Sequence, residues 1–139
     1  MRHAIFEGLI YNEVGQPAEV VYLGERPFYV ILDGDFRRHV EAEYVDRQIL
    51  KWLHEQILQE KDTVVQAAMS FLGRDDLFTK AMLDSSIAHF DEQFEQLMQI
   101  GLPAEARTWL AMLGFHAVVD VHGDVVEIHM PEPPGGEDE

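Results

Sequence analysis

The spacing of apolar residues changes twice along this chain, from a strand-like period to a helical one and back again. Between Ile5 and about Val40, β-branched and aromatic residues recur in short runs that turn residues separate. This pattern predicts an antiparallel meander of about four strands, at residues 5–11, 19–23, 28–32 and 36–40. The third run is apolar at nearly every position, so we expect it to be a central strand that is covered on both faces.

From Ala42 onward the apolar residues fall every three or four positions, which predicts three or four central helices. The first runs through about Gln59. Whether a new helix begins near Asp62 or the first one continues is left open by the pattern. Gly73 is a candidate left-handed C-cap, and Asp75 or Asp76 is a candidate N-cap for the helix that follows. A last short helix is expected between Pro103 and Gly114.

Residues 115–130 return to strict alternation, which predicts a C-terminal β-hairpin. With a turn at Gly123 and Asp124, Val119 would face Ile128 and Asp120 would lie opposite Glu127. One face would then be apolar, formed by Val119, Val121, Val126 and Ile128. The hairpin could complete or extend the N-terminal sheet, or it could pair across a dimer axis with a second copy.

These patterns together predict an α+β fold in which residues 1–130 form a single domain. At this length one hydrophobic core can stabilise the fold without disulfides or metals. Residues 131–139 contain only proline, glycine and acidic residues. Such a segment cannot bury enough apolar surface to become ordered, so we expect a disordered acidic tail.

The chain is strongly acidic, with 26 Asp and Glu against 10 Lys and Arg and a formal net charge of −16. Nucleic-acid and anionic-membrane surfaces depend on clustered Lys and Arg, so neither a nucleic acid nor a membrane is an expected partner. There is no cysteine, which excludes disulfides and thiolate chemistry. The N-terminus meets a charge at Glu7 before a signal-type apolar core could form, so we expect a cytoplasmic protein.

The polar face of the predicted hairpin holds the residues best suited to bind a metal. Imidazole nitrogens and carboxylate oxygens are ligands for divalent transition metals, and neighbouring strands could bring them together. The candidate ligands are His116, Asp120, Glu127 and His129. A solvated face is the favoured interpretation, because no tight ligand motif such as His-Glu-x-x-His occurs.

Other chemistry is poorly supported by the sequence. Arg37, Arg38 and His39 form a basic cluster, but neighbours on a strand point to opposite faces and cannot clamp one anion together. We expect the arginines to pair with neighbouring acids such as Asp35, Glu41 or Glu43 instead. No glycine elbow surrounds Ser85 or Ser86, and no glycine-rich phosphate loop occurs, so an enzyme is not favoured.

Two functional hypotheses from different classes follow. The leading one is a non-catalytic interaction or regulatory module without a cofactor, which self-associates as a homodimer or binds a protein partner. Its two tryptophans, four tyrosines and six methionines are types enriched in interface cores. The alternative is a small metal-binding protein or metal-dependent hydrolase that uses the four hairpin candidates and a divalent transition metal.

Overall fold

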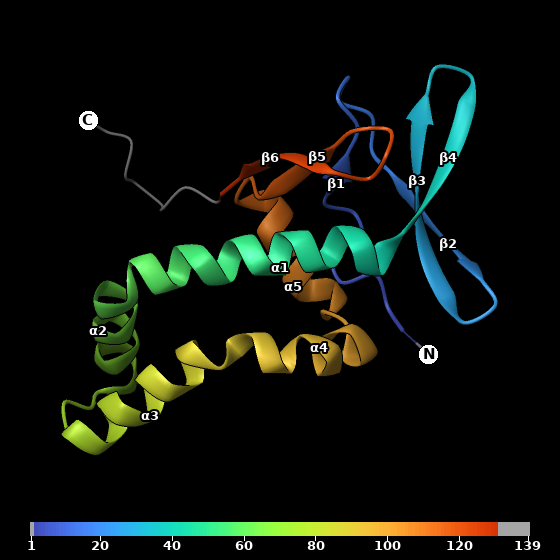
Figure 1. The fold of residues 1–139 in the computed structure, drawn as a ribbon. Coiled ribbons are helices and arrows are strands. Elements are labelled where there is room, and N and C mark those ends of the chain that lie inside the picture. The colour runs from blue at the N-terminus through green and yellow to red at the C-terminus, as the bar shows by residue number, and fades with distance from the viewer. Residues whose placement is uncertain (1, 131–139) are drawn as a thin grey trace, which may run out of the picture. The chain divides into compact units, whose positions relative to one another are not determined.

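The structure of the chain, a computed structural model, describes residues 2–130 (Figure 1). It forms two compact units: residues up to Ile49 together with those from Gln96 onward make the first, and Leu50–Glu95 make the second. The helix α1 (Ala42–Gln59) begins in the first unit and ends in the second. The predicted α+β class is confirmed. That residues 1–130 fold as one domain stays a prediction, and the predicted tail at 131–139 lies outside the described residues.

One sheet of the first unit is an antiparallel meander of three strands, β2 (Glu19–Leu23), β3 (Arg26–Asp33) and β4 (Phe36–Glu41). Two-residue turns join the strands, and the first residue of each turn is a glycine with positive φ, Gly24 or Gly34. Hairpin turns of this length require such a conformation. The central strand is β3, as predicted, and its consecutive residues 29–31 are all buried, so both of its faces are covered.

The first predicted strand, at residues 5–11, is extended only at its end. Residues 5–9 form turns, because two of their backbone N–H groups donate to side chains rather than to a strand. The N–H of Ile5 donates to Asp46 Oδ2 at 2.8 Å, and the N–H of Phe6 donates to the Tyr29 hydroxyl at 3.2 Å. The apolar side chains of this segment are nevertheless buried, which is why its composition resembles that of a strand.

The second sheet of the first unit joins β1 (Ile10–Tyr11) to the C-terminal hairpin, β5 (His116–Val119) and β6 (Val125–His129). The strands β1 and β5 are parallel, and β5 and β6 are antiparallel. The predicted hairpin is therefore confirmed, and it extends the strand that precedes the meander. Pro17 pairs with Tyr11 in a single antiparallel bridge, and the two sheets are separate.

The register of the hairpin differs from the predicted one by two residues. Ala117, not Val119, lies opposite Ile128, and Glu127 lies opposite Val118, so the predicted pairing of Asp120 with Glu127 is wrong. The connection is a five-residue loop at 120–124 rather than a two-residue turn. Asp120 causes this, because its Oδ1 accepts the N–H groups of residues 122 and 124 at 2.9 and 3.0 Å.

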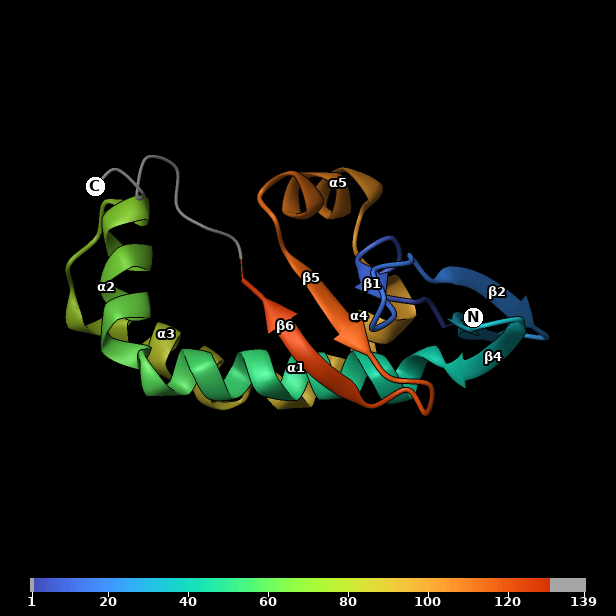
Figure 2. The same ribbon diagram turned by 90° about the horizontal axis from the view of Figure 1, so that it is seen from above.

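The loop of the hairpin lies beside the first half of α1 (Figure 2), where Gln48 binds it. The Gln48 side chain donates to the carbonyl of Gly123 and accepts the N–H of Val125, both at 2.9 Å. A Cβ at Gly123 would lie 2.2 Å from Val40 Cγ1, and the φ of this glycine is +87°. The close approach and the positive φ together make glycine necessary here.

The predicted apolar face of the hairpin is confirmed only in part. Val119 is fully buried, whereas Val126 is 51% exposed. The irregular register between Val118 and Val119 breaks the alternation that the prediction assumed.

The second unit is helical. After α1 come α2 (Lys61–Leu72), α3 (Leu77–Ala88) and a 3₁₀ turn, η1 (Phe90–Gln93). The helix α4 (Phe94–Ile100) begins in this unit and ends in the first unit, to which α5 (Ala104–Met112) belongs. Gly73 caps α2 with φ +70°, and Asp76 caps α3, as predicted. Residues 2–130 hold five α-helices rather than three or four, because Glu60 and His89 leave helical geometry. None of the helices in this part of the chain is long and apolar enough to cross a membrane.

Candidate functional site

Three of the four candidate metal ligands lie together on the C-terminal hairpin. His116 and His129 are cross-strand partners whose rings stack at 4.2 Å with an angle of 16° between their planes. The Nε2 of His129 lies 2.5 Å from Oε2 of Glu127, and the Nδ1 of His116 lies 3.1 Å from the carbonyl oxygen of Gly114. Stacked rings face each other, so their nitrogens do not converge on one point.

The fourth candidate, Asp120, does not join this group. Its carboxylate is occupied in the hairpin loop, where it accepts two backbone N–H groups. Within residues 2–130, no three His, Cys, Asp or Glu side chains are grouped so that they could hold a metal ion. The hairpin histidines thus form a stacked pair with one glutamate, beside a hollow that Tyr11 and Glu13 also line.

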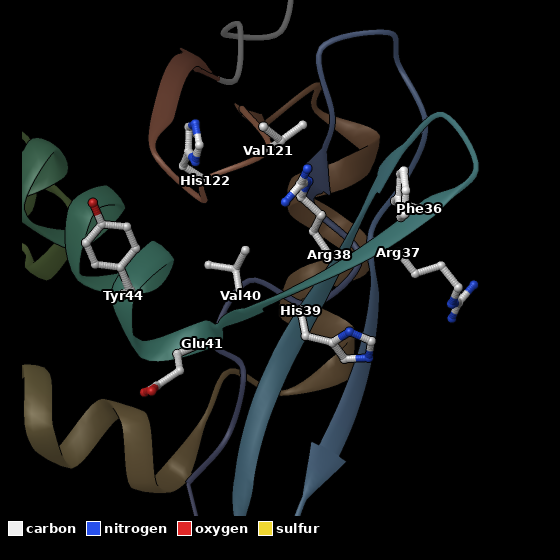
Figure 3. Close-up of a pocket in the computed structure, with 9 residues that line it drawn as sticks. All are labelled: Phe36, Arg37, Arg38, His39, Val40, Glu41, Tyr44, Val121 and His122. Atoms are coloured by element: carbon white, nitrogen blue, oxygen red, sulfur yellow. The ribbon is translucent and has the colours of Figure 1, made fainter.

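A hollow of about 800 Å³ lies along β4 in the first unit. All six residues of the strand line it, together with Tyr44 from α1 and residues 121–122 from the hairpin loop. Figure 3 shows Arg38 and Val40 on the side of the strand that faces Val121, and Arg37 and His39 on the other side. The hollow is open rather than enclosed, which suits an extended ligand better than a small molecule.

The basic cluster behaves partly as predicted. Arg37 pairs with Glu19 at 3.3 Å and Arg38 pairs with Asp33 at 2.8 Å, both on the surface. Glu19 lies on β2, with β3 between it and β4, and Asp33 ends β3. Glu41 pairs instead with Arg26 at 2.8 Å. Exposed pairs of this kind contribute only about 0–1 kcal/mol each, so they exchange readily for another carboxylate.

A second candidate surface is the corner of the second unit where α2 ends and α3 begins. Large apolar side chains are exposed there in both helices: Phe71 is 90% exposed, Leu77 82% and Phe78 71%. Leu72 and Met82 beside them are also more than half exposed. Monomeric proteins seldom leave so many neighbouring apolar side chains in water unless another molecule covers them. We call residues 71, 72, 77, 78 and 82 the apolar corner.

The apolar corner has a well-defined backbone. The N–H groups of Gly73 and Arg74 donate to the carbonyls of Ser70 and Met69, which closes α2. Asp76 then opens α3 by accepting the N–H of Thr79 at 2.9 Å. The hydrogen bonds from the backbone N–H and the hydroxyl of Thr79 lower the pKa of Asp76 to about 2. The exposed side chains are therefore held on capped helices rather than on a loop.

The interior of the second unit is small. Its buried side chains are Leu50, His54, Val65, Met69, Thr79 and Phe94. His54 belongs to this interior: its Nε2 lies 2.7 Å from the carbonyl oxygen of Ile87, and its ring meets Phe90 and Phe94 edge-on. A helical unit of this size with so few buried apolar groups gains little stability of its own.

A buried acid lies in the first unit and was not singled out by the sequence. Asp46 and Tyr29 are fully buried, and the Tyr29 hydroxyl donates to Asp46 Oδ1 at 2.7 Å. Burial raises the pKa of the Asp46 carboxyl to about 7, against the opposing effect of its hydrogen bonds. Its partners fasten the N-terminal turns, so the pair has a structural role.

The apolar corner was also missed, although a signal for it exists in the sequence. Phe71 with Leu72, and Leu77 with Phe78, are adjacent apolar pairs on helices. Adjacent residues on a helix point about 100° apart, so one member of each pair tends to leave the buried stripe.

The chain matches no protein-family model, no curated protein and no solved structure.

Proposed function

We propose that this protein is a non-catalytic interaction module that self-associates through the apolar corner of its helical unit. The observation that carries the proposal is the exposure of Phe71 at the end of α2 and of Leu77 and Phe78 at the start of α3. Fully burying a Phe or Leu side chain stabilises a complex by about 1.5–3 kcal/mol, so a second copy that covers this corner gains from every one of them.

The small interior of the second unit supports the same proposal. Leu50–Glu95 is close to the size at which isolated units need oligomerisation or another staple. Two copies that bring their corners together would bury the ends of α2 and α3 against one another, as in a helical bundle. A contact of this kind is isologous, because the same surface is used by both copies.

Charge also favours a second copy at this place. The whole chain carries −16, so two copies repel each other over most of their surface. Positions 71–82 are neutral, because Arg74 and Lys80 offset Asp75 and Asp76. Lys80 also pairs with Asp84 at 3.0 Å. Two corners can therefore meet without the repulsion that the rest of the chain would cause.

Sedimentation velocity of the full chain over a range of concentrations tests this proposal. We expect a reversible dimer in the native chain and a monomer when Phe71→Ser and Phe78→Ser are combined. Both side chains are largely exposed, so the double variant should keep its helical circular dichroism. Trp109→Ser is the matched control, because Trp109 is an aromatic residue that is 61% exposed on α5 of the first unit.

Two results would count against the proposal. One is a native chain that sediments as a monomer at every concentration. The other is a dimer that survives in the double variant or is lost in the Trp109 control.

The cytoplasm is the compartment we propose for this activity, and a fluorescent fusion in living cells would test it.

A further inference from the structure

The strand β4 is an edge of the three-stranded meander. The order of that sheet is β2-β3-β4, so within the described residues one side of β4 has no strand beside it. Such an edge presents backbone N–H and C=O groups that another extended segment can pair with. The hollow of about 800 Å³ along β4 leaves room for a segment at this edge.

The side chains of β4 give this edge an unusual charge. Arg37, Arg38 and His39 are consecutive, and the flanking residues on the strand are Phe36 and Val40. Because neighbours on a strand alternate, Arg38 stands on one face of the sheet while Arg37 and His39 stand on the other, as Figure 3 shows. Two arginines on opposite faces cannot hold one small anion, but a strand added at the edge has side chains on both faces and can contact both arginines.

The opposite edge of the same sheet is different. The strand β2 carries Glu19 and no Lys or Arg. The strand β4 carries two arginines against the single Glu41, so an acidic segment meets net attraction along β4 and a like charge along β2.

A second copy of β4 does not suit this edge. Antiparallel pairing of two β4 strands would bring the Arg37, Arg38 and His39 side chains of both copies together, and like charges across strands destabilise a pair. The arginines therefore protect β4 from pairing with itself and leave the edge to a segment of opposite charge.

The arginines are also accessible. Their side chains are 54% and 49% exposed, and their present partners, Glu19 and Asp33, are surface carboxylates. A carboxylate on an incoming strand can replace either of them without breaking a buried interaction.

We propose that the free edge of β4 is a docking site for an extended acidic segment of a partner protein, which adds to the meander as a fourth strand. Its backbone pairs with β4, and its successive Asp or Glu side chains meet Arg38 on one face and Arg37 on the other. This site belongs to the first unit and does not depend on the self-association proposed above.

Fluorescence anisotropy with a short labelled peptide tests the proposal on the full chain. The probe carries consecutive Asp and Glu residues at its centre, between valine and threonine residues that favour extended structure. We expect saturable binding that weakens as salt is added. A second peptide with Asn and Gln in place of the acids, and a third with methylated backbone amides along one edge, should both fail to bind.

Charge reversal separates strand addition from binding to one face of the sheet. Arg37→Glu and Arg38→Glu should each weaken the probe by about tenfold or more, because each removes a charged hydrogen-bond donor and adds repulsion. Lys51→Glu is the control, since it makes the same change of charge on an exposed position of α1 and should leave binding unchanged. A circular dichroism spectrum like that of the native chain shows that each variant is folded.

Three outcomes would overturn the proposal. If the methylated peptide binds as well as the probe, backbone pairing is not involved. If Arg38→Glu weakens binding and Arg37→Glu does not, the ligand lies on the Arg38 face of the sheet and not along the edge. If no peptide binds at low salt, β4 is not a docking site.

Discussion

Asp46 and Tyr29 form a fully buried acid–phenol pair that holds the N-terminal turns against α1 and β3. The Tyr29 hydroxyl donates to Asp46 Oδ1 at 2.7 Å, and the Ile5 N–H donates to Asp46 Oδ2 at 2.8 Å. The hydroxyl oxygen of Tyr29 also accepts the N–H of Phe6. Two side chains from different elements thus satisfy backbone donors that no strand pairs with.

The raised pKa of Asp46 makes stability depend on pH. Its pKa is about 7 in the folded chain and has its ordinary value of 3.8 when unfolded, so the folded chain binds the proton more tightly. The stability that this proton contributes is complete below the unfolded value and is lost as pH rises through about 7. The loss is on the order of 4 kcal/mol.

We expect Asp46→Asn to remove this pH dependence, because the amide cannot ionise. Urea unfolding of both chains at about pH 5 and about pH 8 measures it. The free energy of unfolding of the variant minus that of the native chain should be larger at the higher pH than at the lower one. An equal difference at both values would show that Asp46 does not titrate in this range.

Gln48 should be important for the position of the hairpin loop. Its amide donates to the Gly123 carbonyl and accepts the Val125 N–H, so Gln48→Ala leaves two backbone groups without these partners. We expect a loss of about 1–3 kcal/mol in the free energy of unfolding. Gln59→Ala, at an exposed position near the end of the same helix, should change it by about 0.5 kcal/mol or less. Equal effects of the two substitutions would contradict this role.

Gly123 and Val40 should be energetically coupled. Gly123→Ala places a Cβ 2.2 Å from Val40 Cγ1 and forces alanine to a φ of +87°, so the variant should be clearly destabilised. Val40→Ala removes the Cγ1 atom that the new Cβ would meet. The double variant should therefore lose less stability than the sum of the losses in the two single variants. Chemical denaturation of the four chains measures this coupling. Strict additivity would mean that the loop does not press on β4.

Local features of the fold were predictable because their causes are local. Gly73 marks the end of one helix and Asp76 the start of the next, because both caps depend only on residues nearby in the sequence. The parallel pairing of Ile10 with Ala117 was not predictable in this way, because no short-range pattern identifies a partner so far away in the sequence. The hairpin register was missed because the Asp120 side chain closes a five-residue loop that the alternation of residues does not indicate. Gln48, far away in the chain, then holds this loop.

The candidate surfaces were harder to predict than the fold. Periodicity shows which face of a helix is apolar, but it does not show whether another element of the same chain covers that face. Leu83 and Ile87 lie on the predicted stripe of their helix and are partly buried, whereas Leu77 and Phe78 in the same helix are exposed. The basic cluster was recognised, but its importance depends on β4 being an edge, and that is a property of the sheet order.

The most direct test of the central claim is a distance measured between two copies at the apolar corner. The chain has no cysteine, so Ser70→Cys, at an exposed position at the end of α2, takes a single spin label. Pulsed electron paramagnetic resonance should give a short, concentration-dependent distance for this label. A label at Thr108→Cys on α5 should give a longer distance or none. A short distance at Thr108 and none at Ser70 would contradict self-association through the corner.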